Sequence, residues 1–590
     1  MTGSRLTALV LFATITSLAV GIGPAPLWDE DEPRFAAIAR AMVETGDWIV
    51  PTYNDELAVD KPVLMHWCMA AAMTLFGINE FAARLPSVLA TLATALGLLW
   101  AGRRWFDERT GAVAALAFVG CLLVGIEGHA ATPDAILVAL TTWATLLAAD
   151  SLRNGMRLPV ARAVGIGGLL GLAVVCKGPV GYVGPLAVVG PWAWWLAMER
   201  RCNSAGTSPP LGRRLAVATI PATLDVVRDL RLFTITAAML AAAGPWYAAV
   251  AVRTGGEWTS GFFFVHNVGR FMAPMERHGG SVFFHPLAML VGFYPWSCFL
   301  PLALVVAVRR VWKRTVAVSE VHLFGLLVFW IAVWMTAFSA AATKLPNYVL
   351  PAYPAAAMLV AALGVEAARR AAAGAWPLPG WIAAGIVSLA CGGIATVATV
   401  LVAVRFGIPG GEPAALVGLV PVAGAAACWW LARRSPMRAL AALTITGLIF
   451  TSLVIGPAAS WVAGANTLPG LVRSAQERTG AGARLGSCGL SYPNVIFYSS
   501  GHVAQFDPRQ PEAMAGFLRS GSTAVLLLPE PAYAAIAASL PEGFGVVARA
   551  RPIFRDHDVI AVARVGTDDV PRTATLPGAA FETPSRSISR

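Results

Sequence analysis

Long apolar stretches alternate with short polar loops along most of the chain. A helix that crosses a lipid bilayer needs about 20 mostly apolar residues, and thirteen segments of the sequence meet this need. They cover residues 5–24, 82–101, 110–126, 133–150, 163–177, 179–197, 233–252, 284–307, 321–341, 346–366, 380–404, 414–432 and 438–461. The pattern predicts a polytopic α-helical membrane protein, with about 13 transmembrane helices in a domain over residues 1–462.

The pattern changes after residue 462. Short apolar runs at 522–528 and 558–564 alternate there with helix-like stretches at 467–479 and 510–519. Such alternation is typical of a small α/β domain, which we expect over residues 463–568. Residues 569–590 are rich in Thr, Pro, Ser and Arg, and this composition predicts a disordered tail.

The composition excludes a soluble globular or a disordered protein, because 57% of the 590 residues are hydrophobic and only 13% are charged. The net charge of +11 would suit a nucleic-acid partner, but its placement argues against one. The arginines gather in alternate loops, at 103–109, 153–162, 200–214, 309–314, 369–370 and 433–438. This is the positive-inside pattern of membrane proteins, so we expect no nucleic-acid partner.

The same arginines predict the topology. They place the N-terminus in the cytoplasm and the loop at 25–81 outside the cytoplasmic (inner) membrane. Thirteen spans then place the domain at 463–568 outside as well. The eight cysteines include no CxxC motif, and we predict no disulfide framework.

The first external loop is unusually rich in carboxylates for a connection between two membrane helices. Pro33 suits the first turn of a helix, with Asp31 or Glu32 as the cap. Apolar residues then recur at helical spacing, namely Phe35, Ile38, Ala39, Met42 and Val43. Lys61-Pro62 opens a second, more apolar helix that ends near Gly77. We predict two helices in the membrane interface that bracket Asp31, Arg34, Asp60 and Lys61.

Several motifs follow one another in the order found in a known family. The first loop contains Asp31-Glu32-Pro33-Arg34-Phe35, Gly46-Asp47-Trp48 and Lys61-Pro62. Later loops contain Thr132-Pro133-Asp134, Lys177-Gly178-Pro179, His266-Asn267-Val268-Gly269-Arg270 and Lys344-Leu345-Pro346-Asn347-Tyr348. This set resembles the bacterial aminoarabinose transferases, which belong to the protein O-mannosyltransferase-like glycosyltransferases of the GT-C class. The resemblance covers about residues 5–460.

The resemblance implies an enzyme that transfers a sugar, with inversion, from a polyprenyl-phosphate carrier. The acceptor would be a lipid A-like lipid or another envelope molecule on the outer face of the membrane. The family's matching aspartate makes Asp31 the expected general base or acceptor-positioning group, since one carboxylate must take the acceptor's proton. Arg34 is three residues further along the same helix face, and Asp134 is the third expected catalytic residue. Glu32, in contrast, is expected to face away.

The resemblance also implies a site for the carrier phosphate. Its matching positions are Lys61, Arg270 and Tyr348, and Lys177 is expected to line the same cavity. Cations and a tyrosine hydroxyl suit the negative charge of a phosphate leaving group. The alternative for Lys61 is a lysine at a helix end that reaches the interface with its ammonium group. For Asp31 the alternative is a helix cap.

A divalent metal, zinc in the family, is the least determined part of the site. Asp60 occupies a position that is usually glutamate in the family, and His266 is its matching partner; His278 and His285 are spare candidates. A carboxylate and one imidazole are too few ligands to identify a zinc site. The alternative is that Asp60 pairs with Lys61 and positions it.

Two functions from other classes compete with a transferase. A transporter or flippase of lipid-linked sugars would place ionisable residues near the membrane midplane, often in a duplicated fold. In this chain the charges gather in external loops and no duplication is visible, which favours the enzyme. A noncatalytic scaffold would leave the acidic and basic motifs unexplained.

Overall fold

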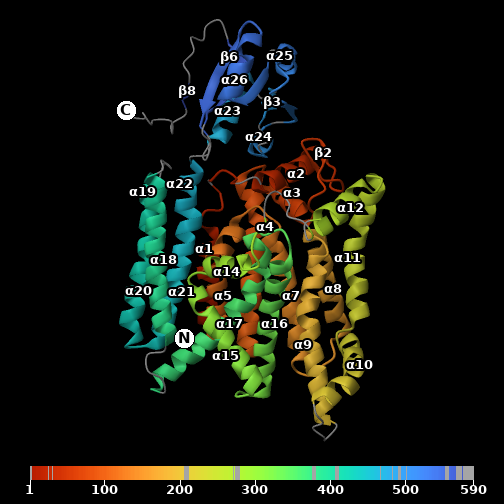
Figure 1. The fold of residues 1–590 in the computed structure, drawn as a ribbon, viewed down its shortest axis with the longest axis vertical. Helices are drawn as coiled ribbons and strands as arrows, with labels where there is room; N and C mark the ends of the chain where they lie inside the picture. Colours follow the sequence, from red (N-terminus) through yellow and green to blue (C-terminus); the bar gives the residue numbers. More distant parts are fainter. Residues whose placement is uncertain are drawn as a thin grey trace.

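The structure is a computed structural model, and it describes residues 3–565 and 574–575 apart from short segments. Those segments are residues 24, 29–30, 205–210, 270–271, 273–278, 375–379, 406–410, 465–466, 481–482, 490–492, 500, 522 and 552–556. Long helices run side by side in a bundle, and a smaller part that contains a sheet lies at one end of it (Figure 1). The predicted tail at 569–590 lies outside the described residues except for 574–575.

The elements of the helical part follow in chain order, first from residue 3 to 269 and then from residue 284 to 464. The first half contains α1 (Gly3–Ala19), α2 (Asp31–Thr45), α3 (Leu64–Phe76), α4 (Glu80–Trp105), α5 (Glu108–Val119), α6 (Leu122–His129), α7 (Asp134–Leu152), α8 (Val160–Lys177), α9 (Val180–Ser204), α10 (Leu211–Asp229), α11 (Leu232–Arg253), α12 (Glu257–Ser260) and the π-helix η1 (Gly261–Gly269). The second half contains α14 (Phe284–Gly292), η2 (Trp296–Cys298), α15 (Leu300–Lys313), α16 (Val318–Ala340), η3 (Pro346–Ala352), α17 (Tyr353–Ala372), α18 (Gly380–Arg405), α19 (Gly411–Ala415), η4 (Leu416–Gly418), α20 (Leu419–Ala432), α21 (Pro436–Leu453), η5 (Val454–Ala458) and α22 (Ala459–Gly464).

The multi-pass membrane protein predicted from the hydrophobic pattern is confirmed, but the number of spans is not. Within the described residues, nine helices are long and apolar enough to cross a membrane by length and composition. A tenth span is counted only if α5 and α6, which meet at a bend of 65°, are one. The span predicted at 284–307 is instead divided into α14 and α15 by the short helix η2. A hydrophobic stretch in the sequence indicates an apolar segment but does not show where the helix within it is interrupted.

The arginine-rich loops share the end of the bundle that lies away from the sheet, where α10 and α15 end (Figure 1). Arg104 and Arg162 come from different helices and lie 2.6 and 3.5 Å from the Asp150 carboxylate. Arg369 lies 3.1 Å from Asp107 in the same way. The alternation of basic loops in the sequence therefore corresponds to one end of the molecule.

Both predicted helices of the first loop are present, as α2 and α3. The apolar residues of α2, among them Phe35, Ile38 and Met42, are buried, where α2 packs on α3 and on the C-terminal helix α24 (Pro493–Tyr498). A short hairpin between them, β1 (Thr52–Tyr53) and β2 (Glu56–Leu57), was not predicted. Asn54 and Asp55 form its turn with φ of 54° and 66°, a conformation that these two residue types tolerate best among those with side chains.

The C-terminal part is an α/β structure, as the sequence predicts. Its elements are α23 (Leu468–Thr479), β3 (Arg484–Cys488), α24, β4 (Val503–Phe506), α25 (Pro511–Arg519), β5 (Ala524–Pro529), α26 (Glu530–Ile536), η6 (Ala537–Ser539), β6 (Phe544–Ala550), β7 (Val559–Arg564) and β8 (Ala574–Thr575). The strands form one sheet in the order β4-β3-β5-β7-β6-β8. Strands β4, β3 and β5 are parallel, and β7 returns antiparallel to β5.

Strand β5 shows why this sheet is covered on both faces. Side chains alternate between the two faces of a strand: Val525 and Leu527 belong to the apolar cluster that includes α23. Leu526 and Leu528 pack instead in a cluster with α25 and α26. A continuous apolar run is the signature of a strand that is buried on both sides.

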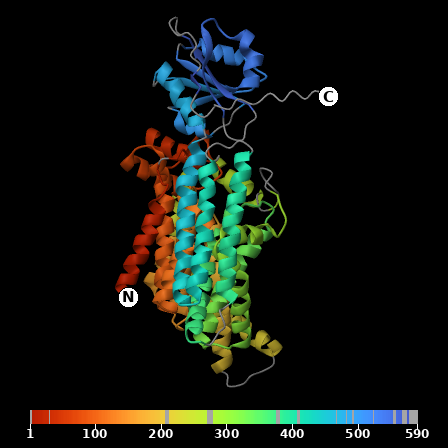
Figure 2. The ribbon, with the colours of Figure 1, turned by 90° about the vertical axis from the view of Figure 1, so that its left-hand side faces the viewer.

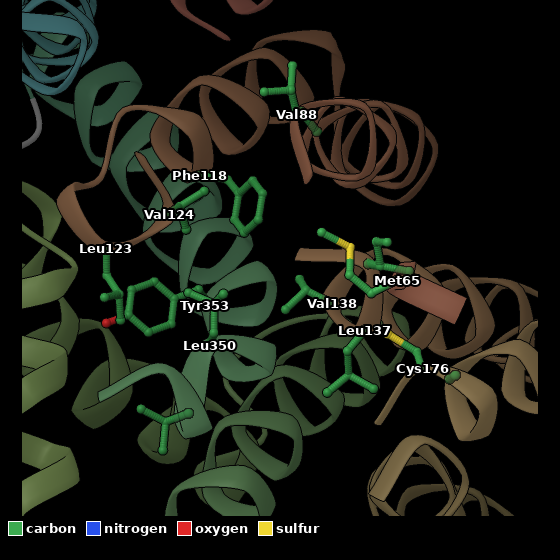
Figure 3. Close-up of a cluster of buried hydrophobic side chains, with 14 of the residues drawn as sticks. Met65, Val88, Phe118, Leu123, Val124, Leu137, Val138, Cys176, Leu350 and Tyr353 are labelled. Carbon is green, nitrogen blue, oxygen red and sulfur yellow. The ribbon is translucent and has the colours of Figure 1, made fainter. Parts of the chain in front are cut away.

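The core of the helical part lies directly beneath the polar residues that the sequence singled out. Figure 3 shows side chains from several helices meeting in one apolar cluster. Cys176 of this cluster precedes Lys177 in the chain, Leu137 lies one turn after Asp134, and Met65 follows Lys61 by four residues; all three are buried. Close packing here fixes the backbone from which the polar side chains extend.

Candidate active site

Charged side chains gather in two clusters at the end of the bundle that carries the first loop. The Arg34 cluster consists of Arg34, Asp60, Lys61 and His66 and belongs to the first loop. The Asp134 cluster consists of Asp134, Lys177, Asn347 and Tyr348 and joins the ends of α7 and α8 to η3. Asp31 lies on the same helix as Arg34, at its first residue.

In the Arg34 cluster, cations surround one buried carboxylate. Arg34 Nη2 lies 3.5 Å from Asp60 Oδ1, and the Arg34 guanidinium also sits over the Tyr53 ring at 5.5 Å. Lys61 Nζ donates to the backbone carbonyl of Asp60 at 3.2 Å. Burial raises the pKa of Asp60, but Lys61 and Arg34 outweigh this effect and hold the pKa below its ordinary value. Asp60 is therefore ionised, and its carboxylate pairs with Arg34 while its backbone carbonyl holds Lys61.

His66 completes this cluster, and no motif in the sequence singled it out. Its side chain is 1% exposed and stacks obliquely on Phe35, with ring centroids 5.8 Å apart. Neither ring nitrogen has a hydrogen-bond partner among the described residues. Burial lowers the pKa of His66 to about 4, against an opposing effect of Asp60. A neutral imidazole is thus enclosed next to three charged groups.

The Asp134 cluster is a buried ion pair that also contacts the Asn347 side-chain amide and the Tyr348 ring. Lys177 Nζ lies 2.5 Å from Asp134 Oδ1, and their side chains are only 14% and 6% exposed. Asn347 Nδ2 donates to the other carboxylate oxygen at 3.2 Å, and Lys177 Nζ lies 5.3 Å from the centre of the Tyr348 ring. The cluster therefore joins three motifs of the sequence that are far apart in the chain.

Lys344 explains how the last of these motifs is held. Its ammonium group donates to the carbonyls of Ser339 and Ala341, each at 2.6 Å, and to that of Phe338 at 3.2 Å. These are free carbonyls at the end of α16, where a cation is also favoured by the helix dipole. Lys344 is thus a helix cap that anchors the turn leading to Asn347 and Tyr348.

A cavity of about 520 Å³ opens beside Asp31. Its polar wall includes Asp31, Glu127, Thr132 and Asn347, and the opposite wall is apolar, formed by residues of α18, η4, η5 and α22. Asp31 is exposed, whereas Asn347 reaches from this cavity to Asp134. Asp31 therefore faces an open space that the Asp134 cluster borders.

Glu127 is a further acidic residue of this wall that sequence reasoning missed. It lies in α6, after the bend, and accepts a hydrogen bond from Thr132 Oγ1 at 3.3 Å. Gly128 allows the close approach of α6 to α4, because a Cβ there would lie 2.7 Å from Thr91 Oγ1. A lone carboxylate inside an apolar stretch was the available signal.

The structure corrects the expectation for Glu32. Instead of facing away, Glu32 is buried and forms an ion pair with Arg84, Nη2 to Oε2 at 2.8 Å. Its carboxylate also accepts from the backbone N–H groups of Trp28 and Ala131, at 2.6 and 2.8 Å. Glu32 therefore holds the start of α2 against α4 and the turn before α7.

Not all expected site residues lie in the described part of the chain. Arg270 and His278 lie outside it. His285 is buried and its Nε2 is 3.2 Å from the carbonyl of Leu345, a structural contact.

The described residues do not fit the expected metal site. Among them, no group of three or more His, Cys, Asp and Glu side chains is placed to hold a metal ion. Asp60 lies among cations, as described above, and these compete with a metal for the carboxylate. The expectation of a zinc ion held by Asp60 and His266 thus finds no support in the described part of the structure.

Comparison with known proteins shows which proteins the chain resembles. Residues 60–223 match the family model described as dolichyl-phosphate-mannose-protein mannosyltransferase. The chain is 30% identical over 370 residues to an undecaprenyl phosphate-alpha-4-amino-4-deoxy-L-arabinose arabinosyl transferase of Aeromonas salmonicida, and the match covers 62% of this chain and 61% of that protein. A transferase of the same name from Pseudomonas paraeruginosa is 29% identical over 434 residues, with 72% and 71% covered.

The chain is similar to the bacterial aminoarabinose transferases. Its fold agrees: the crystal structure of ArnT from Cupriavidus metallidurans, bound to undecaprenyl phosphate, superimposes with a TM-score of 0.74 at 21% identity, and covers 95% of this chain and 97% of that one. The predicted resemblance and the GT-C-like fold are thereby confirmed. The match to the Aeromonas relative spans about three fifths of that protein's length.

Proposed function

We propose that this aminoarabinose transferase relative is an inverting glycosyltransferase. It would move a sugar from a polyprenyl-phosphate carrier to a lipid A-like or other envelope acceptor. The observation that carries the proposal is the position of α2: Asp31 faces an open cavity, while Arg34, three residues on, lies in a cluster of cations with Lys61. Helix α2 thus places a carboxylate at the cavity and, three residues on, a guanidinium in the cluster with Lys61.

The reaction that these residues suit is a single displacement at the anomeric carbon. An oxygen of the acceptor attacks that carbon, the bond from carbon to phosphate oxygen breaks, and the carrier phosphate leaves with the electron pair. Asp31 takes the proton of the acceptor. Lys61 and Arg34, and by the family resemblance Arg270, stabilise the charge on the phosphate.

The Asp134 cluster has a different part in this proposal. Lys177 shares its charge with Asp134, so we assign the pair to positioning Asn347 at the cavity and Tyr348 toward the carrier. The phosphate would then be bound chiefly by the Arg34 cluster, with the Tyr348 hydroxyl as a further donor.

The shape of the cavity suits a lipid acceptor. Its apolar wall is formed by helices at the periphery of the bundle, α18 and α22, and its polar end is at Asp31 (Figure 2). Acyl chains would lie along the apolar wall with the polar head at the carboxylate. The positive-inside pattern supports an extracytoplasmic position for this end at the inner membrane. The names of the relatives make undecaprenyl phosphate and 4-amino-4-deoxy-arabinose the first carrier and sugar to test.

Mass spectrometry of envelope lipids from cells with and without the protein tests the proposal. Purified protein in vesicles with an undecaprenyl-phosphate-linked sugar and a lipid acceptor should yield a lipid heavier by one sugar, and free carrier phosphate. A flippase would move the donor across the vesicle membrane and leave both lipids at their original masses, which would refute the transferase.

A further inference from the structure

The C-terminal part sits directly on the first loop, at the end of the bundle that carries the candidate site (Figures 1 and 2). Helix α24 packs on α2, and two ion pairs and several hydrogen bonds join the C-terminal part to residues between Leu27 and Glu80. This arrangement brings a domain remote in sequence close to Asp31.

Tyr498, the last residue of α24, contacts the chain at Leu27, four residues before Asp31. Its hydroxyl accepts a hydrogen bond from the Leu27 backbone N–H at 3.0 Å and donates one to Glu80 Oε1 at 2.8 Å. A phenol can accept and donate at once, so it joins the segment before α2 to the first turn of α4. Arg473 adds to this contact, 5.6 Å from the Tyr498 ring centre.

The segment that Tyr498 reaches is otherwise held from inside the helical part. Arg84 donates to the carbonyls of Ala25 and Pro26, at 2.7 and 3.0 Å. The N–H of Trp28 donates to Glu32. Within this segment, the Leu27 N–H is the group that bonds to the C-terminal part, through the Tyr498 hydroxyl. Tyr498 therefore completes the attachment of the chain that leads into α2.

Two other contacts fix the C-terminal part on either side of Tyr498. Arg40 Nη1 donates to the carbonyl of Phe497 at 2.8 Å and to that of Ser499. The Asn54 side chain both donates to the carbonyl of Val503 and accepts from its N–H, each at 2.9 Å. Because β4 is the edge strand of the sheet, the Asn54 amide pairs with it as a neighbouring strand would.

We propose that Tyr498 is a positioning residue, through which the C-terminal domain holds Asp31 at the cavity. Its hydroxyl bonds to Leu27 and Glu80, and so fixes the backbone four residues before the carboxylate. The inference rests on the proposed function in one respect, since it takes Asp31 as the general base. It assigns the C-terminal domain to the alignment of the base rather than to binding of the carrier phosphate.

Tyr498→Phe tests this inference, because it removes one oxygen and keeps the ring. In the full-length protein we expect kcat to fall about tenfold with the KM for the donor unchanged. Hydrogen–deuterium exchange of peptides covering residues 25–35 should become faster. Tyr533→Phe is the matched control: this ring packs in the α25 and α26 cluster of the same domain, and its change should alter neither readout.

Unchanged hydrogen exchange at residues 25–35 in Tyr498→Phe would show that the Tyr498 hydroxyl does not hold this segment. Faster exchange with an unchanged kcat would show that the contact does not position Asp31. A rise in the donor KM alone would assign the domain to carrier binding and contradict the inference. Failure of the wild-type protein to transfer any sugar would instead refute the proposed function. The exchange measurement distinguishes the two cases, because it needs no turnover.

Discussion

The carboxylate of Glu32 is clamped by the guanidinium of Arg84, Nε to Oε1 at 3.0 Å and Nη2 to Oε2 at 2.8 Å. Both side chains are buried. Glu32 directly follows Asp31 on α2, and Arg84 lies on α4. A bidentate pair of this kind has fixed geometry as well as charge. It sets the direction in which the first turn of α2 leaves the membrane part.

Removal of one charge from this pair should destabilise the protein strongly. Glu32→Gln keeps the shape but leaves the buried Arg84 without a counter-charge, which costs roughly 3–5 kcal/mol. We expect a large drop in the thermal unfolding temperature of the protein in detergent. Glu44→Gln is the control, because Glu44 forms a more exposed pair with Arg40 and such pairs are worth at most about 1 kcal/mol. Equal unfolding temperatures for the two variants would contradict the account.

The Asp134 and Lys177 side chains should behave as a coupled pair. Lys177→Met leaves a buried carboxylate unpaired and Asp134→Asn leaves a buried ammonium unpaired, so each alone is expected to lower stability by roughly 3 kcal/mol or more. The double variant leaves neither charge and should recover most of that loss. A double-mutant cycle in thermal unfolding measures the coupling; additive losses would show that the two groups do not pair.

Because His66 is buried in its neutral form, we expect the free energy of unfolding to fall in mild acid. Its pKa is about 4 in the folded protein, below the ordinary value of 6.5. Between these values the unfolded chain takes up a proton and the folded one does not, so stability falls as the pH falls from 6.5 to about 4. The loss reaches roughly 3 kcal/mol, at 1.36 kcal/mol per pKa unit. His66→Phe should flatten the pH dependence of the unfolding temperature in this window, and an unaltered slope would contradict a buried neutral imidazole.

Lys61 should act on the donor rather than on the acceptor. Lys61→Ala removes one charge-assisted hydrogen bond to the carrier phosphate, worth roughly 1.5–3 kcal/mol. We expect the KM for the polyprenyl-phosphate sugar to rise about 10- to 100-fold. Lys313→Ala, at the other end of the bundle on α15, is the control. Unchanged donor kinetics in Lys61→Ala would mean that this lysine only extends to the interface.

The parts of the fold predicted from the sequence are those with a local pattern. Pro33 and the apolar spacing from Phe35 to Met42 predicted α2, and Gly77 the end of α3. The continuous apolar runs at β5 and β7 predicted the sheet. The hairpin at Asn54 and Asp55 was missed because strands of two residues carry almost no periodicity.

The parts of the site that were missed depend on contacts between distant residues. Glu32 lies in the predicted first loop and Arg84 in the predicted span at 82–101, and nothing local shows that they meet in a buried pair. The same holds for Lys177, whose charge is matched by Asp134 from another helix. Glu127 was missed because it directly follows the predicted span at 110–126, whereas in the structure it belongs to α6, after the bend, and lines the cavity.

The central claim, that Asp31 is the general base, is tested most directly by the turnover of Asp31→Asn. Asparagine caps helices about as well as aspartate but cannot take the acceptor's proton, so kcat should fall roughly a hundredfold or more while unfolding and donor binding stay unchanged. Asp55→Asn makes the same substitution at the exposed turn of the hairpin and should keep full activity. Wild-type turnover by Asp31→Asn would contradict the claim and leave Asp31 as a helix cap.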